Sequence, residues 1–131
     1  MKYVCLGFHD EQEWAALPPG EREALMEETA AYAGLLRQNG HLIDQKALQE
    51  ASAAATLRFS GGRMLVCDGP FAETKEQLGG FMLLEANDLN HAIQLMSKIP
   101  CMRAGGSLEI RPVNEGITER IDQAEMHGQV A

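Results

Sequence analysis

Apolar residues recur with two different periods along the chain, and these periods predict its secondary structure. Residues 3–8 form a short apolar run with β-branched and aromatic members, which predicts a buried strand. Between residues 20 and 39 the apolar side chains instead recur every three or four positions, as on one face of a helix. Gly40 then predicts the end of that helix.

The middle of the chain predicts a β-hairpin. Two apolar runs, residues 56–59 and 64–67, flank the sequence Ser60-Gly61-Gly62-Arg63. The Gly-Gly pair favours a type I′ turn, because both central residues of that turn need a positive φ. Residues 41–48, ahead of the hairpin, carry a weaker pattern that predicts a short or irregular strand.

The second half of the chain repeats the alternation of strand and helix. Residues 80–85 predict another buried strand, and the helix that follows has Asp88 as its N-cap and ends at Pro100. Residues 107–111 alternate with period two, so Arg111 is expected to point away from the core.

The resulting order, β-α-(β)-β-β-β-α-β, predicts an α+β fold of the ferredoxin-like, split-βαβ type. Both helices are expected to cover one face of an antiparallel sheet. Since no third helix is predicted for the other face, two copies are expected to pair through their sheets as a homodimer. Residues 1–113 are expected to form this domain. Residues 114–131 form a polar tail that either folds into one short helix or frays.

Composition narrows the class of protein further. A chain of 131 residues is long enough for one domain with its own core. The formal net charge of −8 argues against nucleic-acid binding through the phosphate backbone. No apolar run approaches the roughly 18 residues that a membrane-spanning helix needs, and the N-terminus does not resemble a signal peptide. We therefore expect a cytoplasmic protein that contacts no membrane.

Neither the cysteines nor the histidines show the spacing of a metal or cofactor site. Cys5, Cys67 and Cys101 form no CxxC pair and are expected to be free, buried thiols. The four histidines are scattered, and His9 is expected at the surface after the first strand. We therefore expect no bound metal and no cofactor.

The segment DGPFAETKEQLGGF, residues 68–81, combines a turn, a cluster of charges and a Gly-Gly pair. It closely resembles the motif of the DGPF subgroup of YCII-related proteins. Further matches lie in the first strand, in residues 20–42 and in residues 104–113, so the resemblance covers about residues 1–113. It implies a ferredoxin-like α+β barrel that dimerises through its sheets.

The resemblance also implies a site and a partner. YCII-like relatives carry a His–Asp pair, proposed to act in acid–base chemistry, in a cavity between helix and sheet. The position of that histidine falls near Thr29 here, and this chain has no histidine between Glu11 and Gly40. DGPF proteins are also often encoded beside extracytoplasmic-function sigma factors, which implies an association with such a factor.

Asp68 ends the second hairpin strand and can be interpreted in two ways. Its carboxylate can bond a backbone N–H in an Asx-type turn. Alternatively it is a general acid or base whose pKa is tuned by Lys75 or Glu76. Gly79-Gly80 precedes a strand rather than a helix, so it predicts a bend or close backbone packing and not a phosphate loop.

The leading hypothesis is a homodimer that binds a small molecule in a sheet-lined pocket, with weak, cofactor-free acid–base chemistry. Asp68 is its candidate catalytic residue, in a cavity of several hundred Å³. Phe71 is expected in the core or pocket wall. The candidate ligand-binding residues are Phe71, Glu73, Lys75, Glu76 and Arg111.

Two rival hypotheses remain open. The first is a regulatory or interaction protein without catalysis, associated with a sigma factor, which would expose residues 68–81 beside an apolar patch. The second is that this motif only builds the dimer, which would bury its charges in satisfied bonds.

Overall fold

A four-stranded antiparallel sheet forms the centre of the molecule. In the computed structural model, which describes residues 1–128, its strands lie in the order β2-β5-β1-β6. The strands are β1 (Lys2–His9), β2 (Leu42–Ala47), β5 (Gln77–Glu85) and β6 (Ser107–Pro112). With one helix between β1 and β2 and another between β5 and β6, this is the ferredoxin-like arrangement that the sequence predicted.

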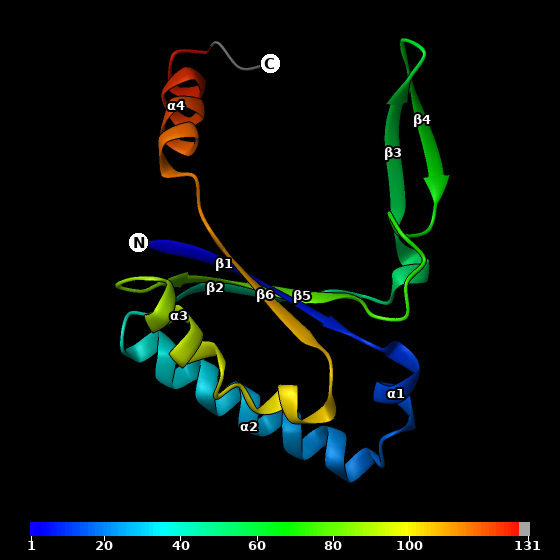
Figure 1. Cartoon of the computed structure of the whole chain (residues 1–131), viewed down its shortest axis with the longest axis vertical. Coiled ribbons are helices and arrows are strands. Elements are labelled where there is room, and N and C mark those ends of the chain that lie inside the picture. Colours follow the sequence, from blue (N-terminus) through cyan, green and yellow to red (C-terminus); the bar gives the residue numbers. More distant parts are fainter. Residues whose placement is uncertain (129–131) are drawn as a thin grey trace.

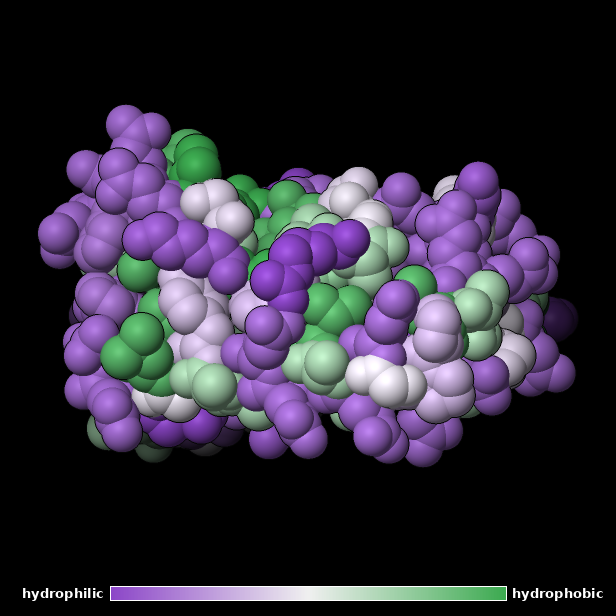
Figure 2. Space-filling view, turned by 90° about the horizontal axis from the view of Figure 1, so that it is seen from below, coloured by the Kyte–Doolittle hydropathy of each residue, from purple (hydrophilic) through white to green (hydrophobic). Residues whose placement is uncertain are grey.

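Two helices, α2 (Pro19–Gln38) and α3 (Leu89–Met96), cover one face of this sheet (Figure 1). Tyr3 and Leu84 lie between the sheet and the helix layer and are the largest fully buried side chains of the core. The Tyr32 hydroxyl of α2 donates a hydrogen bond of 2.6 Å to the carbonyl of Leu95, and burial raises the pKa of this tyrosine. The outer surface of the helix layer is mainly hydrophilic (Figure 2).

Three short elements were not predicted from the sequence. They are helix α1 (Glu11–Ala16) and the 3₁₀ helices η1 (Ala51–Ala53) and η2 (Pro100–Ala104). The six-residue helix α1 is too short for an apolar period to show. No helix within residues 1–128 combines the length and the hydropathy that crossing a membrane requires.

The predicted hairpin is present, but it does not join the central sheet. Strands β3 (Ala55–Ser60) and β4 (Arg63–Asp68) form a separate two-stranded sheet. Gly61 and Gly62 have φ values of 58° and 76°, as the predicted type I′ turn requires. The hairpin rises from the side of the sheet opposite α2 and α3 (Figure 1).

The C-terminal segment forms a further helix, α4 (Glu115–Met126), with the side chain of Asn114 as its cap. Of the two predicted alternatives for this segment, the short helix is therefore correct; residues 129–131 lie outside the described part of the chain. Helix α4 rises from the same side of the sheet as the hairpin, at the opposite end (Figure 1).

The sheet face between these two projections, which we call the open face, is covered by no helix of the described chain. Because Tyr3 and Cys5 point into the core, the alternation of the strand places Val4 and Leu6 on the open face. Leu83 pairs with Val4 and belongs to the same face. Ion pairs flank this apolar strip at both edges of the sheet, namely Asp44–Lys46 at 3.6 Å and Glu109–Arg111 at 3.0 Å.

Candidate functional site

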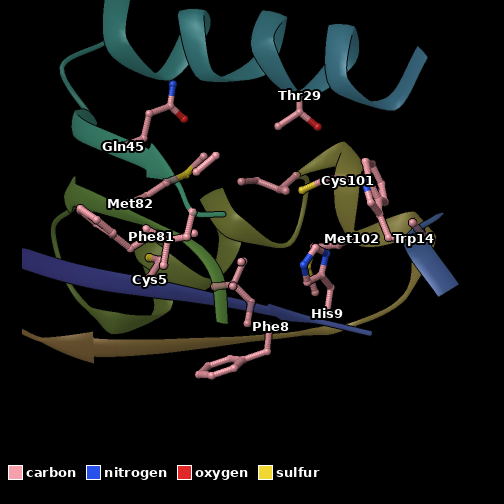
Figure 3. Close-up of a pocket in the computed structure, with 18 of the residues that line it drawn as sticks. Cys5, Phe8, His9, Trp14, Thr29, Gln45, Phe81, Met82, Cys101 and Met102 are labelled. Carbon is pink, nitrogen blue, oxygen red and sulfur yellow. The ribbon is translucent and has the colours of Figure 1, made fainter. Parts of the chain in front are cut away.

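A cavity of about 620 Å³ lies on the covered side, between the sheet and the helix layer. Strands β1, β2 and β5, helices α1 and α2 and the segment η2 all contribute to its lining. Its walls are mainly apolar or sulfur-containing (Figure 3). The side chains that give it this character include Cys5, Trp14, Met26, Met82, Cys101 and Met102. This volume suits a small organic molecule.

Among the polar residues that line this cavity, three come from different elements: His9 from β1, Thr29 from α2 and Gln45 from β2. The side chain of Thr29 points from α2 towards the cavity, and that of His9 points towards it from β1 on the opposite side (Figure 3). The buried Thr29 Oγ1 has no hydrogen-bond partner among residues 1–128. Since a buried polar group without a partner is destabilising, this hydroxyl is suited to bond a ligand.

The Gly-Gly pair of the sequence motif makes room for this arrangement. A Cβ atom on Gly79 would lie 2.8 Å from Nε2 of His9, and one on Gly80 would lie 2.8 Å from the carbonyl oxygen of Lys46 in the neighbouring strand. Both distances are too short for a real contact. The prediction of close packing at these glycines is therefore confirmed, and the histidine occupies the space that the missing side chain leaves.

Helix α1 closes the end of the cavity beside His9. Its N-cap Asp10 accepts backbone hydrogen bonds from Gln12 and Glu13, at 2.9 and 3.2 Å. This cap fixes the first turn of α1, which carries Trp14. The centroid of the Trp14 ring lies 6.3 Å from that of His9, and both residues line the cavity.

The three cysteines are all free, and they differ in how deeply they are buried. Cys5 lies in the core and lines the cavity, and burial raises the pKa of its thiol to about 11. At neutral pH the thiol is therefore protonated and is not a nucleophile. The prediction of free thiols is confirmed, but the prediction that all three are buried is wrong, because Cys67 is exposed on β4. Within residues 1–128, no three His, Cys, Asp or Glu side chains gather closely enough to hold a metal ion.

Asp68 does not touch this cavity, so that expectation was wrong. It lies exposed at the end of β4. Its carboxylate accepts no hydrogen bond in the described chain, and the turn depends on other groups. The N–H of Gly69 bonds the carbonyl of Ala54 at 2.7 Å, and the Thr56 hydroxyl bonds the carbonyl of Gly69 at 2.8 Å. The Asx-type turn is therefore absent, and an acid–base role for Asp68 stays a prediction.

Phe71 was expected in the core or pocket wall, but it is three-quarters exposed in the single chain. The guanidinium of Arg58 lies over its ring, 5.0 Å from the centroid. Arg111 points away from the core, as predicted, and pairs with Glu109 on the open face. Neither Phe71 nor Arg111 lines the cavity.

Glu73 and Lys75 line a second, open hollow beside α1, while Glu76 is exposed and lines neither hollow. Lys75 Nζ lies 3.9 Å from Glu13 Oε1, and because both side chains are largely exposed this pair contributes little to stability. The ligand-binding roles of these residues stay predictions, since none lies at the larger cavity.

Two residues that do line the cavity carried signals in the sequence. Thr29 lies near the position at which the resemblance to YCII-like proteins implies a histidine. His9 ends the first strand and was expected at the surface, but it is partly buried and reaches into the cavity. Gly79, directly before the strand predicted for residues 80–85, is the other sign that a neighbouring side chain needs space there.

Comparison with known proteins places the chain in a family. Residues 1–116 match the YCII-related domain family. An uncharacterised protein of Rhizobium meliloti (strain 1021) is 38% identical over 114 residues, which cover 86% of this chain and 92% of that protein.

Among solved structures, the chain is similar to 5-chloro-2-hydroxyhydroquinone dehydrochlorinase from Burkholderia phenoliruptrix AC1100, in complex with 2,5-dihydroxybenzoquinone. The TM-score is 0.45 at 14% sequence identity, over 87% of this chain and 94% of the other. Both the family match and the sequence relative extend over most of the chain, and we conclude that it belongs to the YCII-related domain family.

Proposed function

We propose that this protein binds a small, largely apolar molecule in the cavity between α2 and the sheet. The observation that carries the proposal is an apolar space of about 620 Å³ lined by Thr29, whose buried hydroxyl has no partner in the described chain. Apolar walls with a few polar groups that fix orientation are typical of ligand sites.

The cavity favours a neutral molecule with a ring and with polar groups at separated positions. Trp14 offers a flat aromatic surface to a ring, and Met82 offers a polarisable thioether. Thr29 and His9 offer hydrogen bonds from opposite walls (Figure 3). Asp10 and Glu13 also line the cavity, and the chain carries a net charge of −8, so an anionic ligand is disfavoured.

Weak acid–base chemistry without a cofactor is part of this proposal, with His9 as the proton-transferring group. A histidine can accept or release a proton near neutral pH, and Thr29 would hold the reacting polar group of the ligand opposite it. In this arrangement His9 and Thr29 take the roles that the resemblance to YCII-like proteins implies for a His–Asp pair.

A direct test uses a panel of neutral ring compounds, such as phenols, lactones and aromatic amides, with binding followed by calorimetry. Thr29→Val removes the hydroxyl and keeps the shape, and we expect it to weaken binding by about 3- to 10-fold. Thr74→Val, in the exposed loop, is the matched control and is expected to bind normally. Equal affinity of Thr29→Val and the parent, or no binding from the panel at millimolar concentration, would contradict the proposal.

We also propose that two copies pair through their open faces as a homodimer. A partly exposed apolar strip between two projections with exposed apolar side chains supports this pairing, because large exposed apolar areas are rare on monomeric proteins. Sedimentation over a range of protein concentrations tests it.

The exposure of Phe71 beside the apolar hairpin favours the other candidate function, in which this surface contacts a different protein such as a sigma factor. Binding of a sigma factor by the monomer, with loss of that binding in Phe71→Ala, would favour this alternative.

A further inference from the structure

The β3–β4 hairpin has one strongly apolar side that residues 1–128 leave exposed. Register pairs Leu57 with Val66 and Phe59 with Met64, so these four side chains share one side, which we call the hairpin face. All four are exposed: Leu57 by 59%, Val66 by 66%, Phe59 by 72% and Met64 by 57%.

The opposite side of the hairpin is covered by the loop that follows it. Thr56 donates to the carbonyl of Gly69, and Arg58 donates to the carbonyl of Phe71 while lying over its ring. The loop therefore supports one side of the hairpin only. An isolated two-stranded hairpin is marginally stable in water, so an apolar side of this size needs a cover.

Helix α4 carries an apolar stripe that the described residues also leave exposed. Ile117 and Ile121 lie one turn apart on the same side of the helix and are 48 and 52% exposed. We call these two residues the α4 stripe. The helix stands clear of the central sheet on the open side, at the end opposite the hairpin (Figure 1).

The positions of these two projections restrict how two copies can pair. When two sheets meet face to face about a two-fold axis, each hairpin meets either the partner's hairpin or the partner's α4, depending on the direction of the axis. The charges distinguish these arrangements. Residues 55–68 contain two arginines and one aspartate, a net charge of +1, whereas residues 115–126 contain one arginine and four acidic residues, a net charge of −3. Pairing like with like would bring two α4 helices of charge −3 together, while exchange brings opposite charges together.

We propose that in the homodimer each hairpin face packs on the α4 stripe of the second copy. This inference rests on the proposed pairing of the open faces and is independent of ligand binding in the cavity. The exchange covers both apolar surfaces at once. Each hairpin is then covered on one side by its own loop and on the other side by the partner's α4. It also assigns the C-terminal helix a function as the docking surface for the partner's hairpin.

Disulfide trapping tests this exchange directly. In a Cys67→Ser background, which removes the exposed hairpin thiol, three proteins are compared: Phe59→Cys, Ile121→Cys and the double variant. After mild oxidation, we expect covalent dimers from the double variant, with a 59–121 link in the peptide mass spectrum, and almost none from either single variant. Links of 59 to 59 or 121 to 121 in the single variants would overturn the proposal in favour of like-with-like pairing.

A cycle of inserted charges supplies a second readout that needs no cross-link. At low salt, Phe59→Glu on the hairpin face and Ile121→Arg on the α4 stripe are each expected to weaken dimerisation by about 3- to 30-fold, and the two changes together are expected to restore most of the loss. Leu35→Glu, at an exposed leucine of α2 on the covered side, is the control and is expected to leave dimerisation unchanged. Losses that simply add would overturn the exchange, while a parent protein that is monomeric throughout would overturn the open-face pairing on which it rests. Neither result changes ligand binding, which Thr29→Val tests separately.

Discussion

The two faces of the central sheet are built from similar residues but have different surroundings. On the covered face, Leu84 packs under the helices and is 0% exposed, while its neighbour Leu83 points to the open face and remains partly exposed. Both strips are apolar, yet only one contacts helices of its own chain (Figure 1). The covered face holds the core and the cavity, whereas the open face lies between two apolar projections.

The two faces therefore call for different binding partners. On the covered side, a buried hydroxyl has no partner among residues 1–128 and belongs to a residue that lines an apolar cavity, and a small ligand can bond the hydroxyl and fill the cavity. On the open side, exposed apolar side chains extend over a strand pair, a sheet and a helix, an area that only another protein surface can cover. The motif at residues 68–76 reaches both regions, because Phe71 lies against Arg58 of the hairpin whereas Lys75 pairs with Glu13 of α1.

The largest expected contrast comes from truncating the neighbouring leucines. Leu84→Ala removes a fully buried side chain, and we expect it to lower the free energy of unfolding by about 2–5 kcal/mol at every protein concentration. Leu83→Ala is the matched variant on the open face. Its loss is expected to appear only at concentrations at which the protein dimerises. Denaturant unfolding at several protein concentrations measures both, and a concentration-independent loss in Leu83→Ala would contradict the account of the open face.

The pH dependence of stability provides the next contrast. Burial raises the pKa of Cys5 from an ordinary value of 9.0 to about 11, so between these values the unfolded chain loses a proton that the folded chain keeps. Stability is therefore full below about pH 9 and falls as the pH rises to 11, by about 2–3 kcal/mol from this group. Tyr32, whose pKa burial also raises, adds a loss in the same direction.

Cys5→Ala is expected to flatten this fall, although the substitution also lowers the overall stability. The informative quantity is thus the slope of the free energy of unfolding against pH. Cys67→Ala, at the exposed cysteine on the hairpin, is the control and is expected to keep the slope of the parent. If the Cys5→Ala and parent slopes are the same between pH 9 and 11, Cys5 is not the buried thiol described here.

A smaller effect is expected from filling the space beneath His9. The added methyl group of Gly79→Ala would displace the imidazole, and we expect ligand affinity to fall by about 10-fold with no change in dimerisation. Gly34→Ala on α2, where nothing lies within 4 Å of the added atom, is the control. An unchanged affinity in Gly79→Ala would show that His9 takes no part in binding.

The sequence predicted the elements of this fold better than the surroundings of its site. Periods of two and about 3.6 identify strands and helices because they depend on which side of each element is buried. They do not say whether a hairpin joins a sheet, and β3–β4 forms its own. Asp68 and Lys75 were predicted as site residues because they are charges in a compact motif, but charge along the sequence does not reveal which side of the sheet a loop reaches.

The cavity residues were harder to identify because they come from separate parts of the chain. His9, Thr29 and Gln45 meet only after β1, α2 and β2 have packed together. Each is an isolated polar residue within or beside an apolar pattern, which in a sequence is indistinguishable from an exposed position. The resemblance to YCII-related proteins provided the useful signal at Thr29.

The seven methionines allow one measurement to test both faces together. Met26, Met82 and Met102 line the cavity, whereas Met64 lies on the hairpin face. In an NMR spectrum of methyl-labelled methionines, we predict that a bound ring compound shifts the three cavity signals and leaves Met64 unchanged. Dilution through the monomer–dimer equilibrium is predicted to shift Met64 and leave the cavity signals unchanged. A ligand that shifts Met64 instead of the cavity methionines, or dilution that leaves Met64 unaffected, would contradict the division of functions between the two faces.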